Sequence, residues 1–249
     1  MAFQTVFKRY ELKYLLTHEQ KQHILGIMSP YMKPDDYGRT TIRNVYFDTD
    51  NYRLIRRSIE KPIYKEKLRI RSYAQADPHS TVFVELKKKY DKVVYKRRLA
   101  LPEEAAMRWT CGDAPCPVDS QISREIDYFL GFYGALRPTV FLSYDREAYF
   151  DREDGVFRVT FDQNILCRRT DLSLTSPAYG QPILDEHMVL MELKCAGGIP
   201  LWMARALSEE RLYKTSFSKY GTAYERYILP QEFPKSLQSK EILIHGSNI

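Results

Sequence analysis

The sequence predicts an α+β protein whose β structure is mostly antiparallel. Eight segments combine apolar–polar alternation with β-branched or aromatic residues, which is the pattern of strands that bury one face. Two pairs of these segments are joined by short polar turns, at Tyr90-Asp91-Lys92 and at residues 151–155, and strands joined in this way run antiparallel. The predicted strands cover residues 3–16, 41–48, 63–74, 80–90, 92–101, 138–150, 155–166 and 187–195.

Segments with helical patterns lie between the strands, and two of them carry clear boundary signals. Thr17, with Gln20 three residues later, forms a capping-box pattern that starts a helix, which we expect to end near Pro30. A second helix begins at Asp119 and ends at Gly134. Further helices are predicted over residues 50–57, 200–213 and 218–229.

The composition favours one domain. The 249 residues, 44% of them hydrophobic, suffice for a sizeable core, and no repeat or linker marks a boundary. We therefore expect a single domain over residues 1–229 and a tail over residues 230–249. No stretch approaches the roughly 20 apolar residues of a membrane span, and the first residues lack the apolar run of a signal peptide. These features predict a cytoplasmic protein, for which any coupling to membrane transport requires a separate partner protein.

The charged residues alternate with apolar ones along the strands, so each strand turns its charges toward one face. These positions hold twelve cations and four anions, a net charge of +8 against +6 for the whole chain. A solvated sheet face usually mixes both signs, whereas concentrated like charge is destabilising unless an anion lies among it. We therefore expect one shared site for a polyanion. The cations are Arg9, Lys13, Lys67, Arg69, Arg71, Lys87, Lys89, Lys96, Arg98, Arg146, Arg158 and Lys194, and the anions are Glu11, Glu85, Asp162 and Glu192.

Nine short motifs, from Arg9 to about Tyr227, together resemble a known family. They are RYELKY, NVYFDTDNY, KLRIRSY, VFVELKKK, KRRL, SYDREAYF, FRVTFDQ, MELKC and FSKYGTA, and each is weak alone, but their order and spacing are specific. The chain resembles the VTC-type polyphosphate polymerase domain of the triphosphate tunnel metalloenzyme (CYTH-like) superfamily. The resemblance implies an eight-stranded antiparallel β-barrel that forms a tunnel, with helices packed outside and a polar interior.

The resemblance also implies an activity and a set of site residues. The activity is polyphosphate synthesis, in which the γ-phosphate of ATP passes to the end of a growing chain with Mn²⁺ or Mg²⁺ as cofactor. The implied metal ligand is Glu192, with Glu11 or Glu85 as helpers, and Lys219 of FSKY lies near the reacting phosphates. The implied catalytic set is Lys219, Arg71, Arg158 and Glu192; the binding set is Arg9, Lys13, Lys67, Arg69, Arg71, Lys87, Lys89, Lys96, Arg98, Arg146, Arg158, Lys194 and Lys219.

The chemistry agrees with this set, because phosphoryl transfer needs positioning and charge neutralisation rather than a protein nucleophile. The first strand carries R-x-E-x-K where the hydrolytic branch of the superfamily carries E-x-E-x-K, which favours the polymerase. Three alternatives stay open: a tunnel triphosphatase acting on NTP or inorganic triphosphate, a non-catalytic polyphosphate-binding module, and an RNA-binding sheet with aromatic residues. Glu192 argues against the binding module. We expect ATP and polyphosphate or triphosphate as partners and no nucleic acid.

Overall fold

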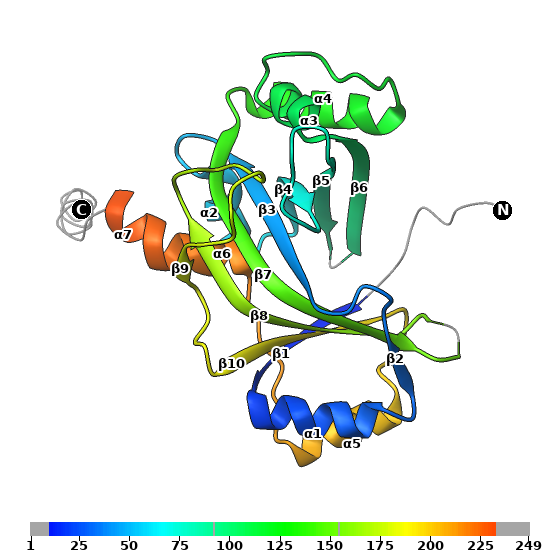
Figure 1. Cartoon of the computed structure of the whole chain (residues 1–249). Coiled ribbons are helices and arrows are strands. Elements are labelled where there is room, and N and C mark those ends of the chain that lie inside the picture. Colours follow the sequence, from blue (N-terminus) through cyan, green and yellow to red (C-terminus); the bar gives the residue numbers. More distant parts are fainter. Residues whose placement is uncertain (1–9, 92, 154, 233–249) are drawn as a thin grey trace, which may run out of the picture.

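The computed structural model describes residues 10–91, 93–153 and 155–232. It is built on one antiparallel sheet with the strand order β1-β10-β8-β7-β3-β4-β5-β6, to which two short strands add, β2 beside β7 and β9 beside β8 (Figure 1). The strands are β1 (Tyr10–Thr17), β2 (Met32–Pro34), β3 (Thr40–Asp48), β4 (Tyr64–Ser72), β5 (Thr81–Tyr90), β6 (Val93–Pro102), β7 (Arg137–Asp151), β8 (Arg158–Arg168), β9 (Gln181–Pro182) and β10 (Met188–Cys195).

The predicted fold class is confirmed, because the protein is α+β and every strand pairing is antiparallel. All eight predicted strands are present, and both predicted hairpins form, β5 with β6 and β7 with β8. Residues 3–9 of the first predicted strand lie outside the described residues. Strands β2 and β9 were not predicted, since three and two residues are too few to show alternation.

The helices follow their predicted signals closely. The capping box of the first helix is present, with Thr17 Oγ1 accepting from the Gln20 N–H at 3.2 Å. Ser120, rather than Asp119, caps the helix that ends at Gly134. Among the described residues, the helix Glu103–Thr110 was not predicted, and the last helix continues to Glu232, three residues past the predicted end at residue 229. The helices are α1 (His18–Met28), α2 (Arg53–Ile59), α3 (Glu103–Thr110), α4 (Gln121–Tyr133), α5 (Leu201–Glu209), α6 (Lys219–Ala223), the π-helix η1 (Tyr224–Ile228) and α7 (Leu229–Glu232).

Two pairs of helices cover the outer face of the sheet at its two ends (Figure 1). Helices α3 and α4 bury Trp109 and Phe129 in a cluster with the outward side chains of β3, β4 and β5. Helices α1 and α5 bury Ile24 and Met203 in a second cluster with side chains of β1, β8 and β10. At these two ends of the sheet the apolar side chains therefore pack outward on helices, which leaves the charged side chains of the same strands on the inner face.

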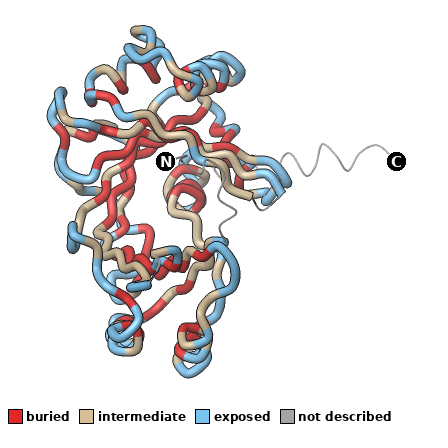
Figure 2. The backbone as a smooth tube through the Cα atoms, turned by 90° about the vertical axis from the view of Figure 1, so that its right-hand side faces the viewer, coloured by how far each residue is buried: buried red, intermediate tan, exposed pale blue. Residues whose placement is uncertain are grey.

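The sheet is strongly curled, and Figure 2 shows its backbone bending round toward itself. Among the described residues no hydrogen-bonded ladder joins β1 to β6, so hydrogen bonds alone do not close the eight-stranded barrel. The segment after α5 helps to fill the gap beside β1, where the Thr215 N–H donates to the carbonyl of Lys13 at 2.7 Å. Helix α6 and η1 then pack within the curl, with Tyr220 and Tyr224 in a third apolar cluster that includes Leu142.

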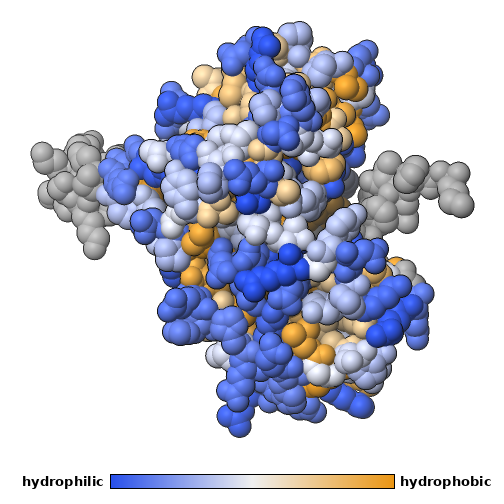
Figure 3. Space-filling view, viewed as in Figure 1, coloured by the Kyte–Doolittle hydropathy of each residue, from blue (hydrophilic) through white to orange (hydrophobic). Residues whose placement is uncertain are grey.

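The described part of the chain has no helix that is long and apolar enough to cross a membrane. On the face seen in Figure 3, hydrophilic residues predominate and hydrophobic residues appear in small groups. The helical segment at the carboxyl end runs to Glu232, and residues 233–249 of the predicted tail lie outside the described residues.

Candidate functional site

Cross-strand register aligns the charged positions of neighbouring strands on the inner face of the sheet. Lys13 on β1 lies opposite Glu192 on β10, and Arg69 on β4 lies opposite Glu85 on β5. Each of these pairs is part of a larger ion-pair cluster that draws cations from several strands. The side-chain alternation seen in the sequence thus brings residues that are far apart in the chain onto one concave surface.

The first cluster is centred on two carboxylates, Asp162 and Glu192, and we call it the Asp162–Glu192 cluster. Arg146 binds Asp162 through two nitrogens, at 2.6 and 2.7 Å, and also reaches Glu192 at 3.3 Å. Lys219 bridges the same two carboxylates, at 2.5 Å from Asp162 and 3.2 Å from Glu192. Lys13 and Lys194 complete the cluster, with ammonium groups 3.2 and 3.4 Å from Glu192.

These contacts keep the cluster ionised although it is deeply buried. Burial would raise the pKa of Asp162, but Arg146 and Lys219 outweigh it and hold that pKa below its usual range. In the same way, burial opposes ionisation of Glu192, while Lys219 and Lys13 keep its pKa well below the ordinary value. Burial would lower the pKa of Lys219, but Asp162 and Glu192 raise it. All three groups therefore carry their charges at neutral pH.

Lys219 reaches this cluster because helix α6 enters the inner face of the sheet. Ser218 caps the helix, and its hydroxyl accepts from the Gly221 N–H at 3.2 Å. Two inner-face lysines bind the residues that precede the helix. Lys67 donates to Ser218 Oγ at 3.3 Å, and Lys13 donates to the carbonyl of Phe217 at 3.0 Å. The FSKY segment is thus fixed by side chains of β1 and β4, far from it in the sequence.

The second cluster surrounds Glu85, and we call it the Glu85 cluster. Arg69 contacts one carboxylate oxygen at 2.7 Å, while Arg98 and Lys96 contact the other at 2.5 and 2.7 Å. Arg71 lies 4.0 Å away. Burial would raise the pKa of Glu85, but the four cations together keep it far below its usual range. Burial and neighbouring arginines lower the pKa of Lys96 to about 7, despite the pairing with Glu85.

Arg71 and Tyr144 connect the two clusters. Arg71 donates to Asn44 Oδ1 at 2.9 Å and to the Tyr144 hydroxyl at 3.0 Å. The Tyr144 ring lies 4.5 Å from the ammonium of Lys219 and 5.1 Å from the guanidinium of Arg146. Burial would raise the pKa of the Tyr144 phenol, but the surrounding cations outweigh burial and lower it.

Lys67 lies between the clusters and has no acidic partner among the described residues. Its ammonium donates to Ser218, and the charges that affect it most are those of other cations. Burial and the neighbouring cations, first among them Lys87, lower the pKa of Lys67 to about 7. Lys67 therefore lacks a compensating negative charge, which a polyanion on the inner face would supply. The cations that act on Lys67 are Lys87, Lys65, Lys13 and Arg69.

Most of the predicted site residues lie on this surface, although they are divided between the clusters. Lys87 pairs with Glu11 at 3.6 Å, which links the two groups. Arg158 and Lys89 make no ion pair among the described residues, and the Arg158 side chain is exposed beside Lys194 in register. Arg9 lies outside the described residues. The predicted site residues found on the inner face are Glu11, Lys13, Lys67, Arg69, Arg71, Glu85, Lys87, Lys89, Lys96, Arg98, Arg146, Arg158, Glu192 and Lys194 of the strands and Lys219 of α6.

Several residues of the site were not assigned from the sequence. Asp162 was counted among the inner anions, but its central place in the first cluster was not predicted. Asn44 and Tyr144 read as ordinary strand residues, yet each accepts a hydrogen bond from Arg71. Lys65 lies on the inner side of β4, where burial and Lys89 lower its pKa. Alternation could have indicated Tyr144, which shares a face of β7 with Arg146, but β3 carries no predicted site residue and so gave no such signal for Asn44.

The predicted metal ligands fit a divalent cation unequally. Glu11 and Glu192 both contact the ammonium of Lys13, at 3.3 and 3.2 Å, so their carboxylates converge on a position that already holds positive charge. Lys87 and Lys13 outweigh burial and hold the pKa of Glu11 at about 2. Glu85 differs, because both of its oxygens are bound by cations of its own cluster. No group of three or more His, Cys, Asp and Glu side chains forms a metal site by itself in residues 10–91, 93–153 and 155–232. A metal ion here would need phosphate oxygens and water as further ligands, which is the usual coordination of Mg²⁺.

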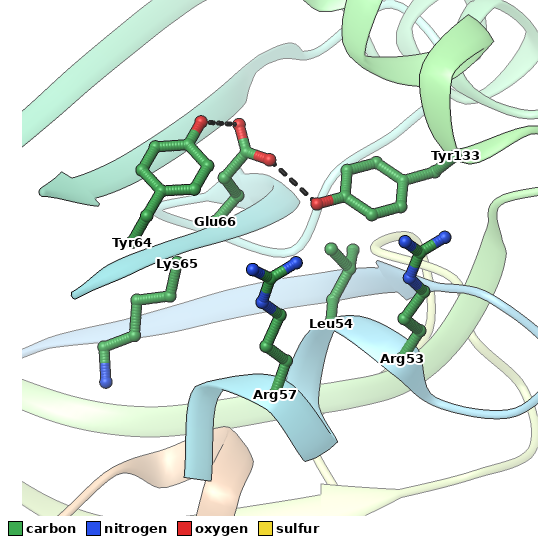
Figure 4. A pocket seen from close by; sticks show the side chains of 7 residues that line it. All are labelled: Arg53, Leu54, Arg57, Tyr64, Lys65, Glu66 and Tyr133. Atoms are coloured by element: carbon green, nitrogen blue, oxygen red, sulfur yellow. Dashed lines mark hydrogen bonds between the residues drawn. The ribbon is translucent and has the colours of Figure 1, made fainter. Parts of the chain in front are cut away.

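A separate recess lies outside the curl, between α2, β4 and α4 (Figure 4). Glu66 accepts hydrogen bonds there from the hydroxyls of Tyr64 and Tyr133, at 2.5 and 2.9 Å. Arg53 and Arg57 point into it from α2, while Lys65 points away (Figure 4). Its volume of about 10 Å³ is enough for roughly one water molecule. The recess is therefore too small for a nucleotide or a phosphate chain, and the inner face remains the candidate site.

Comparisons with known proteins agree with this fold and surface. The family model described as the VTC domain matches residues 8–228. No curated protein sequence gives a significant match to the chain. A crystal structure from Bacillus halodurans named "putative adenylate cyclase" has 15% sequence identity and a TM-score of 0.54, covering 90% of this chain and 97% of that one. At this identity the likeness shows a shared fold and nothing of the activity.

Two further solved structures are more distant. A protein from Vibrio parahaemolyticus, also named "putative adenylate cyclase", has 12% identity and a TM-score of 0.45, covering 88% of this chain and 98% of that one. The PH1819 protein from Pyrococcus horikoshii has 12% identity and a TM-score of 0.43, covering 87% and 99% of the two chains. The family match, which spans nearly all of the described residues, supports a tunnel-type phosphate-handling enzyme. The chain belongs to the VTC domain family and has the triphosphate-tunnel fold that its motifs predicted.

Proposed function

We propose that this protein is a polyphosphate polymerase, which transfers the γ-phosphate of ATP to the end of a growing inorganic polyphosphate chain. The observation that carries the proposal is the concave inner face, on which lysine and arginine side chains from β1, β4, β5, β6, β7 and β10 meet and where Lys67 contacts Ser218 but no carboxylate among the described residues. A chain of linked phosphates supplies several negative charges along one line, and it can therefore neutralise cations on adjacent strands together. The family match supports a phosphate ligand.

The proposed substrate contacts follow the chemistry of the side chains. Arginine grips phosphate oxygens through a rigid planar fork, whereas lysine acts as a mobile point charge. Arg146 and Arg158 would hold the triphosphate of the nucleotide near Lys219, and Lys67 and Lys87 would neutralise the adjoining phosphates. The remaining proposed binding residues are Arg9, Lys13, Arg69, Arg71, Lys89, Lys96, Arg98 and Lys194.

Glu192 and Glu11 would hold the Mn²⁺ or Mg²⁺ ion that the family fold implies, and the bound ion would neutralise charge on the phosphate oxygens. Glu85 would serve instead to hold Arg69, Arg98 and Lys96 at fixed positions. In the transfer step, a terminal oxygen of the polyphosphate chain forms a bond to the γ-phosphorus of ATP. The bond from that phosphorus to the bridging oxygen breaks, and ADP leaves. Lys219 would stabilise the negative charge on the transferred group.

The lowered pKa values of the inner carboxylates favour phosphoryl transfer to a phosphate chain over transfer to water. Hydrolysis is helped by a base that takes a proton from water, and such a base works best with a pKa near the operating pH. The inner carboxylates instead have lowered pKa values, because cations surround them, so they are weak bases. A terminal phosphate is already an anionic nucleophile and needs no base. We place the reaction in the cytoplasm, with any movement of the product across a membrane assigned to a separate partner protein.

The test is an incubation of the purified protein with ATP and Mn²⁺, with and without a short polyphosphate primer. Products are separated on a polyacrylamide gel stained for polyanions, and free phosphate is measured in parallel. Long chains that appear together with ADP are the expected result. Free phosphate without long chains would instead identify a triphosphatase. Tight binding of polyphosphate without either product would identify a binding module.

A further inference from the structure

A second hydrogen-bond network centres on the buried Asp48, which lies at the end of β3 and has no exposed surface. One carboxylate oxygen accepts from the N–H groups of Thr49 and Leu54, at 2.9 and 2.8 Å. The other accepts from the N–H of Ile55 at 3.0 Å and from the hydroxyl of Tyr220 at 3.0 Å. Asp48 thus binds the start of α2 and the start of α6 at the same time.

Three contacts hold Tyr220. Its hydroxyl donates to Asp48 and lies within hydrogen-bond distance of Thr139 Oγ1, at 3.2 Å, and its ring packs against Tyr46 with ring centroids 4.9 Å apart. The phenol stays protonated and can donate, because burial and the Asp48 charge raise its pKa well above the usual value. Tyr220 directly follows Lys219 in the chain, and the Lys219 ammonium lies between Asp162 and Glu192. The two neighbours therefore extend from α6 into different parts of the interior.

Helix α6 has little internal structure to fix its position. It spans only five residues, Lys219–Ala223, and continues directly into a π-helical turn. Together with η1 and α7 the helical segment runs to Glu232, and a segment of this length still depends on tertiary contacts for its stability. The hydrogen bond from Tyr220 to Asp48 is a buried contact of that kind, formed one residue from Lys219.

We propose that Tyr220 and Asp48 are positioning residues that hold Lys219 at the reacting phosphates. Tyr220 acts through Lys219 and does not itself touch the substrate. This inference rests on the proposed function in so far as Lys219 is taken to bind the transferred phosphate. Without the hydroxyl of Tyr220, α6 loses its hydrogen bond to Asp48. The contacts of Lys13 and Lys67 remain, but they are with the residues that precede the helix, so we expect the Lys219 ammonium to move relative to Arg146. A misplacement of about 1 Å in a positioned group can reduce a rate by roughly 100-fold.

The chain offers a matched control for removal of this hydroxyl. Tyr224 lies one turn further along, is equally buried, and its hydroxyl has no hydrogen-bond partner among the described residues. Tyr220→Phe and Tyr224→Phe therefore delete the same atom from neighbouring buried rings, with an anchoring hydrogen bond lost only in the first. We expect Tyr220→Phe to lower kcat by roughly 10- to 100-fold. We expect Tyr224→Phe to leave kcat unchanged.

A double-mutant cycle separates positioning from a merely structural effect. Binding of inorganic tripolyphosphate is measured by calorimetry for the wild type, Tyr220→Phe, Lys219→Met and the double variant. Tyr220→Phe should weaken binding several-fold in the wild-type chain and have no effect in the Lys219→Met chain. Equal weakening in both backgrounds, or none in the wild type, would overturn the positioning role. If Tyr220→Phe does not fold, 4-aminophenylalanine at position 220 provides the second variant. Its amino N–H can donate to Asp48, so the variant should bind tripolyphosphate about as tightly as the wild type. Weak binding by a folded variant would count against the positioning role.

The cycle uses a ligand that is not turned over, so its result does not depend on polymerase activity. A wild-type protein that binds tripolyphosphate but makes no polyphosphate would refute the proposed function alone. Additive effects in a protein that does make polyphosphate would refute the positioning role alone. A wild-type protein that does not bind tripolyphosphate would contradict both.

Discussion

Glu11 on β1 and Lys87 on β5 form an ion pair at 3.6 Å, although their strands lie near opposite ends of the sheet order. The contact exists because the sheet curls until the inner faces of its two ends approach one another (Figure 2). Glu11 also contacts Lys13 at 3.3 Å, and Lys13 contacts Glu192. The pair therefore joins the Asp162–Glu192 cluster to the lysines of β4 and β5, and the inner face is one continuous surface.

Glu11→Gln should separate the structural role of this pair from its proposed metal role. The side chain of Lys87 is 43% exposed, and ion pairs of this exposure contribute about 0–1 kcal/mol. We expect the free energy of unfolding to change by less than about 1 kcal/mol. The Mn²⁺ concentration for half-maximal activity should rise several-fold, which a metal titration at fixed ATP measures. An unchanged titration would remove Glu11 from the metal site.

Lys67 makes phosphate binding dependent on pH. Its pKa of about 7 lies below the usual value, so near neutral pH a fraction of the free protein has a neutral Lys67. A bound polyanion favours the ammonium and raises this pKa, so binding takes up protons between about pH 7 and 9. Calorimetry in two buffers of different ionisation enthalpy measures the uptake. Lys67→Met should bind tripolyphosphate more weakly and take up fewer protons, whereas Lys33→Met, an exposed lysine on β2, should match the wild type.

The same lysine affects stability with a defined sign. The folded pKa is lower than the unfolded one, so the unfolded chain binds more protons between about pH 7 and 10. The contribution of Lys67 to the unfolding free energy therefore rises as pH rises through this window. Thermal unfolding of the wild type and Lys67→Met across the window should show a difference that shrinks toward high pH. A constant difference would contradict the lowered pKa.

Arg158→Ala and Arg71→Ala should both reduce activity, but only Arg71→Ala should destabilise the fold. Arg158 is exposed and makes no ion pair in the described parts of the chain, so Arg158→Ala should change the unfolding free energy by less than about 0.5 kcal/mol. Arg71→Ala leaves Asn44 and Tyr144 without a donor, which costs about 1–3 kcal/mol. Both should lower the transfer rate by roughly 100-fold. Arg205→Ala, on the exposed side of α5, is the control, and full activity in both test variants would refute the site.

Glu192→Gln should abolish metal-dependent turnover and destabilise the fold. Removing one member of a buried ion cluster leaves the others uncompensated, at a cost of about 3 kcal/mol. Because the folded pKa of Glu192 is lowered, its stabilising contribution is present above its unfolded pKa and is lost as pH falls through the acid range. Denaturant unfolding at pH 7 and pH 4 should therefore show a larger difference between wild type and variant at pH 7. Glu209→Gln, exposed on α5, is the matched control.

Much of this site could be predicted because side-chain alternation in a strand has a period of two. The side on which Lys13, Arg69 and Glu85 lie follows from their immediate neighbours alone. The choice of ion-pair partners did not follow, since it depends on the register between strands distant in the chain, such as Lys13 opposite Glu192. Local patterns carry no information about that register.

The contacts of α6 with Asp162, Glu192 and Asp48 could not be predicted from the sequence and are seen only in the folded structure. The FSKY motif indicated Lys219, but its contacts with Asp162 and Glu192 arise because α6 packs within the curl. Asp48 and Tyr220 belong to recognised motifs, yet nothing local shows that their side chains meet. Helix α3, by contrast, has a start signal in the sequence itself, because Pro102 is followed by two glutamates in the first turn.

The most direct test of the account is the fate of the γ-phosphate during the first turnovers. The protein is mixed with γ-labelled ATP, Mn²⁺ and a short polyphosphate primer, and label in chains is separated from label in free phosphate. The account predicts that most of the label enters chains longer than the primer, in proportion to the ADP released. Label that appears only as free phosphate, at the rate at which ADP forms, would contradict transfer on the inner face.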